Sequence, residues 1–289
     1  MHLVPLALVA LTGSIALASQ DDAPPSPWQN QPRNSWTLSF EPRIWYAGPS
    51  GDIRFPGGTA SDDKIDLADL NSDDPRVTPY GELRFQRGRW RIEIAGSAFD
   101  ADNSSTIATT QTLGSVAVFA GERARLDFAH ASFEARALYR FYQYVDGSTA
   151  DGRDIVQFTI HAGGGLRITH IDLDLAVIPT DPARIGNEIT SLSYTHTFAE
   201  PIIAASMGLQ VYERFDLRVE GTAGYFSTGD SSSASFSIEP TFGWYPVDNL
   251  GIEIGYRMLI HRMEDGKDPS QFEWNGSIAG LFAGVSVRF

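Results

Sequence analysis

Apolar and polar side chains alternate along most of the chain, and this period of two constrains the fold more than any other feature of the sequence. Over 252–257, for example, Ile, Ile and Tyr alternate with Glu, Gly and Arg. Such alternation is the signature of β-strands whose two faces meet different surroundings. It recurs in ten segments, at 35–46, 77–87, 90–101, 123–142, 154–171, 199–211, 215–226, 234–245, 250–261 and 274–289. We therefore expect an all-β chain of about ten strands, within a range of about eight to twelve.

The connections between the expected strands are short and long in turn. The short ones are 88–89, 213–214 and 246–249, with 143–153 of medium length, and the long ones are 47–76, 102–122, 172–198, 227–233 and 262–273. An even number of antiparallel strands, with short turns at one end and long loops at the other, is typical of β-barrels that span a bacterial outer membrane. The pattern predicts a single antiparallel transmembrane β-barrel over 35–289, with short periplasmic turns and long outer loops.

The N-terminus is expected to direct export and then to be removed. Leu3 to Ala18 is almost wholly apolar and ends with small residues at positions 16 and 18. This favours a signal peptide over 1–18, cleaved after Ala18, because a helix needs about 20 residues to cross a bilayer. Residues 19–34 are rich in proline, asparagine and glutamine, and we expect a periplasmic linker there. No later apolar run is long enough for a membrane-spanning helix.

The last expected strand carries the most specific signal in the chain. Its apolar residues stand at alternate positions, which are Leu281, Ala283, Val285, Val287 and Phe289. In this strand, and in 224–226 and 255–257, the sequence resembles bacterial outer-membrane β-barrel proteins, whose final strand ends in an aromatic residue read by the barrel assembly machinery. The resemblance implies a barrel in the cell outer membrane, with outer-membrane lipid, lipopolysaccharide and the assembly machinery as partners. It makes Leu281, Val285, Val287 and Phe289 the assembly signal, and it implies no particular activity.

The polar positions of the expected strands carry nine arginines, seven glutamates and no lysine. They are Glu41, Arg43, Glu82, Arg84, Arg91, Glu93, Glu134, Arg136, Arg140, Arg167, Arg218, Glu220, Glu239, Glu253, Arg257 and Arg288. The guanidinium fork pairs with carboxylates in a bidentate way that lysine does not match. A barrel of eight strands is filled by its own side chains, and ten strands lie close to that limit. We therefore predict an Arg/Glu network that plugs the lumen or leaves a narrow pore.

Several functions fit such a barrel. The leading prediction is a structural role or a passive small-solute pore, without enzymatic activity, and a surface-loop adhesin is an alternative. His130 and Ser132 resemble the His-x-Ser pair of the outer-membrane lipid A 3-O-deacylases, but the alternation turns both toward the lumen and away from acyl chains. His170, Asp172 and Asp174 stand near the expected outer rim, where the omptin proteases have an Asp–His couple. Aspartate and histidine are also common at strand ends and in loops without a catalytic role. A secreted soluble barrel that binds an apolar ligand is a third class.

Composition narrows these choices further. The chain has no cysteine, and its histidines lack ligand spacing, so we expect neither a metal nor a cofactor. The net charge is −14, which disfavours nucleic acid as a partner, and the acidic excess falls on the expected outer loops. Aromatic residues at strand ends predict interfacial belts; they are Trp36, Trp45, Tyr46, Trp90, Phe99, Tyr142, Tyr144, Tyr212, Phe215, Tyr225, Phe226, Trp244, Tyr245, Phe272 and Trp274.

Overall fold

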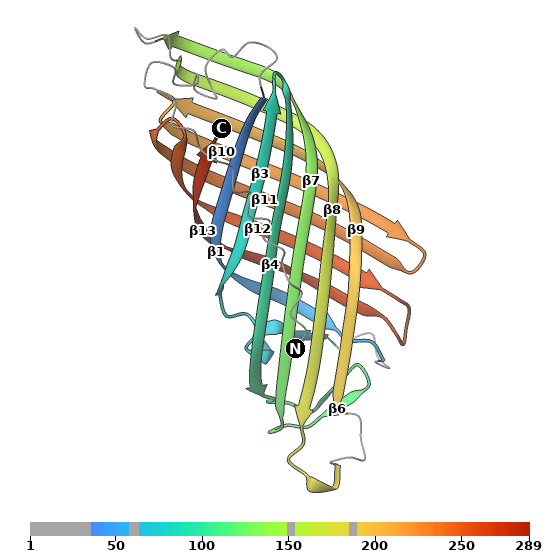
Figure 1. Ribbon diagram of the computed structural model, residues 1–289. Helices are drawn as coiled ribbons and strands as arrows, with labels where there is room; N and C mark the ends of the chain where they lie inside the picture. The colour runs from blue at the N-terminus through green and yellow to red at the C-terminus, as the bar shows by residue number, and fades with distance from the viewer. Residues whose placement is uncertain (1–35, 58–63, 149–153, 185–189) are drawn as a thin grey trace, which may run out of the picture.

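Ten long antiparallel strands form a closed ring in the computed structural model, which describes residues 36–57, 64–148, 154–184 and 190–289 (Figure 1). The ring strands are β1 (Trp36–Arg54), β3 (Arg76–Arg87), β4 (Trp90–Thr106), β7 (Arg123–Ser148), β8 (Asp154–Ile178), β9 (Ser191–Val211), β10 (Phe215–Thr228), β11 (Ser231–Val247), β12 (Leu250–Asp265) and β13 (Phe272–Arg288). Each strand pairs with its neighbour in chain order, and β13 pairs with β1 to close the barrel. The predicted all-β antiparallel barrel of about ten strands is confirmed.

The two ends of the barrel differ as the sequence predicts. The end with Trp36 and Arg288 has short turns, such as 88–89 between β3 and β4, and we call it the turn end. The opposite end, toward the lower right of Figure 1, carries the longer connections, and we call it the loop end. One predicted long loop, 227–233, is instead the two-residue turn 229–230 between β10 and β11. The expected signal peptide at 1–18 and linker at 19–34 lie outside the described residues. Within the described residues, no helix is long and apolar enough to cross a membrane.

Most ring strands run further toward the loop end than the sequence predicts. β8 continues to Ile178 instead of ending at 171, and β9 begins at Ser191 instead of 199. The alternation continues through these extensions, but the apolar side chains change from the outward face to the inward face. Segments predicted as loops because their outward face is polar are therefore strand, and the barrel wall is longer than expected.

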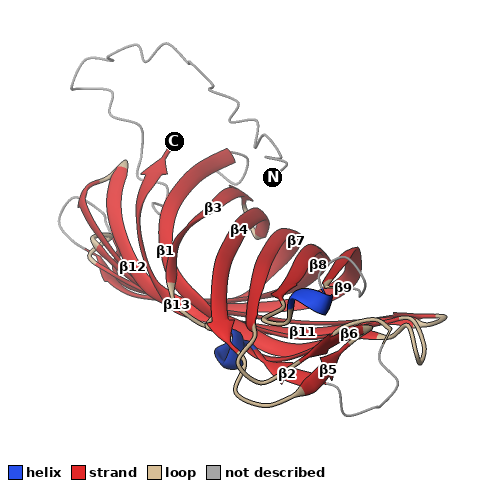
Figure 2. Cartoon of the chain, turned by 90° about the horizontal axis from the view of Figure 1, so that it is seen from below, coloured by secondary structure: helices blue, strands red, loops and turns tan. Residues whose placement is uncertain are grey.

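Short elements of the loop-end connections fold into the mouth of the barrel (Figure 2). They are β2 (Lys64–Asp66), η1 (Leu67–Leu70), β5 (Gln111–Leu113), β6 (Val116–Val118) and η2 (Pro182–Arg184). The Asp66 side chain accepts a hydrogen bond from the Ala68 backbone N–H at 2.9 Å, which caps η1. Burial of Leu67 and Leu70 beside it anchors the first long connection against the wall.

Glycines allow β7 and β8 to pack where no side chain fits. A Cβ built on Gly163 would lie 1.9 Å from the carbonyl oxygen of Ala137, and one on Gly165 would lie 2.1 Å from that of Ala135. Both distances are far below van der Waals contact, so Gly163 and Gly165 allow this close approach.

Candidate functional site

The exterior of the barrel is apolar, while charged side chains fill much of its interior. Ile203 is 71% exposed and Leu281 is 66% exposed, and both belong to a band that runs around the ring. Other large exposed members of this band are Phe40, Ile44, Ile92, Phe133, Leu166, Leu217, Phe236, Phe242, Ile252, Ile254 and Val285. A continuous apolar band of this size is far larger than the patches that soluble monomers expose. Its distribution is that of a barrel whose outer wall faces lipid.

The predicted lumen residues come together in the turn-end half of the barrel. All of the sixteen except Arg140 are buried, each being at most 8% exposed. Arg140 is only half-buried and lies at the turn end, where its backbone N–H donates to the Arg89 carbonyl oxygen. A register shift between Arg140 and Tyr142 interrupts the alternation there. Arg140 precedes the bulge and stays on the inward series of β7, opposite the buried His161, but it forms no ion pair with the described residues and so stands apart from the network.

Glu220 of β10 is the carboxylate that gathers most guanidinium groups. Its oxygens lie 3.1 Å from Arg218, 3.4 Å from Arg84 and 3.6 Å from Arg91. Arg136 of β7 also donates a hydrogen bond to Glu220 from the facing wall. These contacts join strands that are not neighbours in the ring, so Glu220 acts as a strut across the lumen.

Arg43 of β1 is the corresponding guanidinium centre. It donates hydrogen bonds to Glu41 at 2.5 Å, to Glu239 at 2.6 Å and to Glu253 at 2.9 Å. The guanidinium carbon also lies 4.8 Å from the ring centroid of Phe282. A single buried arginine thus connects three carboxylates and an aromatic face, which uses both the edge and the face of the guanidinium.

A second tier of ion pairs lies nearer the loop end. Arg167 of β8 lies 3.0 Å from Glu134 and 3.3 Å from Glu200, and Arg257 of β12 lies 3.1 Å from Glu134 and 3.3 Å from Glu239. Glu200 was missed by the sequence prediction because its inward neighbours on β9, Ile202 and Ala204, are apolar. Both faces of this strand therefore look alike in the sequence.

One group of three acidic side chains in the described part of the chain is close enough to share a cation. The carboxylates of Glu82, Glu93 and Glu220 lie within 4.8 Å of one another and are buried. Arg84 already donates to Glu82 at 2.8 Å and to Glu93 at 3.0 Å, and Arg136 donates to Glu93 and Glu220. Because guanidinium groups donate to both oxygens of Glu93 and Glu220 and to one oxygen of Glu82, we assign the trio to the ion-pair network and not to a metal.

Toward the loop end the interior changes from charged to apolar. On β7, Glu134 and Arg136 face inward on the turn-end side, and Leu126 and Phe128 face inward on the loop-end side. The outward face of β7 changes in the opposite sense: it is apolar on the turn-end side and polar on the loop-end side, where Arg125 is exposed. This exchange of polar and apolar faces is visible in the sequence, because the polar positions shift by one residue near 129. A search for alternation alone does not detect such a shift.

This inversion corrects part of the aromatic prediction. Trp45, Phe99, Tyr245, Phe272 and Trp274 are buried inside the barrel and do not belong to interfacial belts. The remaining predicted belt aromatics in the described residues stay on the exposed wall; examples are Trp36, Tyr46, Trp90, Tyr212, Phe215, Tyr225 and Trp244. Trp45, Phe99, Phe272 and Trp274 belong to a hydrophobic core at the mouth of the barrel. Tyr245 lies instead at the turn end, where its hydroxyl donates to Glu253 at 2.9 Å.

His130 and Ser132 face the lumen, as the sequence analysis expects, between the charged and the apolar parts. His130 is 2% exposed, and its ring centroid lies 5.3 Å from that of His261 and 5.8 Å from that of Trp274. Within the described residues, neither His130 Nε2 nor the Ser132 hydroxyl has a hydrogen-bond partner. A lipid acyl chain on the outer wall does not reach these side chains.

The acidic residues near the predicted outer rim stand on the outer wall. On neighbouring strands, Asp102 lies opposite Asp127, and Asp127 lies opposite Asp174. Arg125 lies 2.6 Å from Asp102 and 3.3 Å from Asp127, and its positive charge partly compensates this row of three aspartates. Burial and the neighbouring Asp102 raise the pKa of Asp127. His170 faces outward with this row, so these groups do not meet in the barrel mouth.

A histidine–aspartate contact does cross the mouth, at a different place. His196 Nδ1 of β9 lies 3.4 Å from Asp265 Oδ2 of β12, and the Tyr194 hydroxyl donates to the same carboxylate at 3.1 Å. The Tyr194 ring stacks on Phe272 with centroids 3.8 Å apart. Because β10 and β11 stand between β9 and β12 in the ring, this group connects two non-neighbouring strands at the loop end.

A buried ion pair fastens two of the loop-end connections to each other. Arg184 of η2 donates to Glu122, and it also donates to the carbonyl oxygen of Ala117 at 2.7 Å. Burial alone would raise the pKa of Glu122. The backbone N–H of Phe119, which donates at 2.9 Å, and the guanidinium of Arg184 outweigh that effect and hold the pKa below its ordinary value of 4.5.

Acid is therefore expected to loosen this contact. A carboxylate with a lowered pKa in the folded state contributes stability that is present above about pH 4.5 and is lost as the pH falls through the lowered value. Hydrogen–deuterium exchange of residues 116–122, corrected for intrinsic rates, is expected to accelerate below about pH 4 while exchange in β13 stays slow. In Arg184→Gln the segment should already exchange faster at neutral pH. Equal pH profiles in both proteins would contradict the assignment.

The final strand presents the expected assembly residues outward. Leu281, Val285 and Phe289 are exposed, and the Phe289 backbone N–H donates to the Leu38 carbonyl oxygen at 2.8 Å where β13 meets β1. Val287 pairs with Leu250 of β12 and with Phe40 of β1. The apolar series of the last strand thus belongs to the exterior band beside the closing seam.

Comparison with known proteins supports the fold but no particular function. No family model and no curated protein sequence matches the chain. Among solved structures, the outer membrane protease OmpT of Escherichia coli is 10% identical with a TM-score of 0.51, covering 88% of this chain and 98% of that chain. Neisserial surface protein A is 13% identical with a TM-score of 0.35, covering 87% of this chain and 97% of that chain. The chain has the β-barrel fold of outer-membrane proteins.

Proposed function

We propose that the protein is an integral outer-membrane barrel with a closed lumen, and that its role is structural rather than that of an open pore. The observation that carries this proposal is the network of buried ion pairs that joins strands far apart in the ring through Arg43 and Glu220, including β3 and β10 on opposite sides. A hydrated solute crossing the barrel would have to displace this network.

The orientation and location follow from the same pattern. The turn end is proposed to face the periplasm and the loop end the outside, as in other barrels of this type. The acidic loop-end wall then stands at the level of the lipopolysaccharide head groups. We propose lipopolysaccharide as the neighbour of this wall, and the assembly machinery as the transient partner of the last strand, whose Leu281 and Phe289 are exposed.

Enzymatic activity has no support from the positions of the groups that suggested it. His130 and Ser132 are enclosed in the lumen, and His170 stands on the outer wall. We therefore propose a non-enzymatic protein that needs no cofactor or metal for its role.

Conductance in a planar bilayer tests the closed lumen. The unmodified protein is expected to insert without steady current steps. In Arg136→Ser/Glu220→Ser, which removes one positive and one negative side chain from the network, steady steps are expected, because the central strut is lost while the charge balance is kept. Heat-modifiable migration on gels confirms that both proteins are folded. Steady steps of equal size in both proteins would contradict the proposal.

A further inference from the structure

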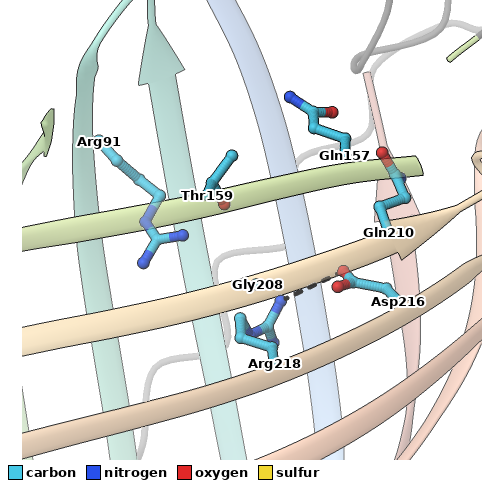
Figure 3. Close-up of a pocket in the computed structure, with 7 residues that line it drawn as sticks. All are labelled: Arg91, Gln157, Thr159, Gly208, Gln210, Asp216 and Arg218. Atoms are coloured by element: carbon cyan, nitrogen blue, oxygen red, sulfur yellow. Dashed lines mark ion pairs between the residues drawn. The ribbon is translucent and has the colours of Figure 1, made fainter. Parts of the chain in front are cut away.

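The two halves of β9 differ in how they are paired. Over Ile202–Val211 the strand lies between β8 and β10 and pairs with both. In this half Gly208 and Gln210 line a space of about 20 Å³, which has room for about one water (Figure 3). Over Ser191–Pro201 the strand pairs with β8 alone. Within the described residues no strand pairs with the other edge of this half, and Figure 1 shows β10 and β11 diverging from it.

The unpaired edge of β9 is long and lies beyond the apolar band. Ile203, in the paired half, belongs to that band, whereas the outward residues at 191, 193, 195 and 197 are serine or threonine and are exposed. At about 3.3 Å per residue, the edge is about 35 Å long. Alternate backbone N–H and C=O groups along a free edge remain for a further strand, so such an edge is a template for an added segment.

Side-chain contacts on the inward face hold this half of β9 in place. The Tyr194 hydroxyl donates to Asp265 of β12 at 3.1 Å, and the Tyr194 ring stacks on Phe272 with centroids 3.8 Å apart. His196 Nδ1 lies 3.4 Å from the same carboxylate. These contacts use side chains and leave the backbone edge open. A strand that is already held extended loses little conformational freedom when it binds another segment.

Uncompensated acid beside the edge favours a cationic partner. Asp172 and Asp174 of β8 lie opposite Thr195 and Ser193 of β9 and face outward. Among the described residues neither aspartate forms an ion pair. Neighbouring strands lie about 4.8 Å apart, so a strand added to β9 would stand about 10 Å from β8. A lysine or arginine side chain on the outward face of that strand can cross the small Ser193 side chain and reach the two aspartates.

We propose that the free edge of β9 binds an extended cationic segment of another polypeptide as an additional strand. Backbone hydrogen bonds to Ser191–Pro201 supply the affinity, and lysine or arginine at alternate positions of the segment pairs with Asp172 and Asp174. The edge lies at the loop end and outside the lumen. This inference therefore goes beyond the proposed structural role, and it does not depend on whether the lumen conducts.

Peptide titration of the full folded chain in detergent tests the edge. The probe is a capped peptide of about ten alternating lysine and threonine residues, for which we expect saturable binding. One comparison peptide carries glutamate in place of lysine. The other carries methyl groups on two adjacent central backbone nitrogens, which removes an N–H from each edge of the peptide. Each comparison peptide is expected to bind at least about tenfold more weakly than the probe. Equal binding of either comparison peptide, or no binding of the probe, overturns the proposal.

Hydrogen–deuterium exchange and one substitution localise the binding. Exchange of residues 191–199 is expected to slow when the probe binds, because their backbone groups become paired. Asp174→Asn should weaken binding of the probe about threefold or more. Asp146→Asn changes an exposed aspartate of β7 at the turn end and should bind the probe as the unmodified protein does.

Heat-modifiable migration shows whether both variants are folded. Unchanged exchange over 191–199, equal affinities of the two folded variants, or a complex of two copies that occupies the edge in place of the peptide overturns the assignment.

Discussion

Replacing Glu220 with alanine is expected to lower the free energy of unfolding by about 3–5 kcal/mol. Four guanidinium groups share this buried carboxylate, and its removal leaves their positive charges facing one another in a space that water cannot fill freely. The loss exceeds that of an ordinary ion pair because the penalty comes from the uncompensated charges that remain. Arg84 keeps Glu41 at 2.7 Å and Arg136 keeps Glu93, while Arg91 keeps Glu93 alone.

Denaturant unfolding in detergent or short-chain lipid measures this effect. Glu264→Ala provides the matched control, because Glu264 also pairs with an arginine, Arg262 at 3.0 Å, but at the exposed wall of β12. That surface pair is expected to contribute less than about 1 kcal/mol. If the two alanine variants unfold at the same denaturant concentration, the lumen network does not stabilise the barrel as described.

The second large effect on the free energy of unfolding is expected when an arginine replaces Ile254 on the outer wall. Ile254 stands in the middle of the apolar outward series of β12 and is 55% exposed. A guanidinium at the midplane of a membrane barrel costs about 2–4 kcal/mol. We expect Ile254→Arg to lower the free energy of unfolding by this amount in lipid bilayers. The loss should be smaller in detergent, where water reaches the wall.

The polarity inversion supplies the control for that substitution. Ser193 of β9 also faces outward, but it lies on the loop-end side of the inversion, opposite Asp174 of β8. Ser193→Arg is expected to change the free energy of unfolding by less than about 0.5 kcal/mol, as at other exposed surface sites. Comparable losses at both positions would mean that the apolar band does not mark the part of the wall that faces lipid.

The architecture was readable from the sequence because alternation and connection length report it independently. The ten strands, their antiparallel order and the inward series on β4 and β10 all follow from a period of two, since successive side chains point to opposite faces. Arg84 and Glu93 could be assigned to one interior face on this basis. Which carboxylate each arginine meets depends on pairs far apart in the chain, such as Arg43 with Glu239, and no local pattern encodes those distances.

The errors share a physical cause. Alternation gives the two faces of a strand but not the medium that each face meets, so a strand leaving the apolar band keeps its period while its faces exchange character. Trp274 and Phe272 were therefore assigned to a belt although they line the mouth. After Arg140 a single extra residue shifts the phase of β7, and a bulge of this kind leaves little trace in the sequence.

The central claim is that side chains of the chain itself close the lumen. Single-channel recording of the unmodified protein, with insertion verified by heat-modifiable migration of the recovered sample, tests this claim most directly. The account predicts a bilayer that contains the protein and shows no steady conductance, with steps appearing only in Arg136→Ser/Glu220→Ser. A steady, porin-sized conductance of the unmodified protein would contradict it.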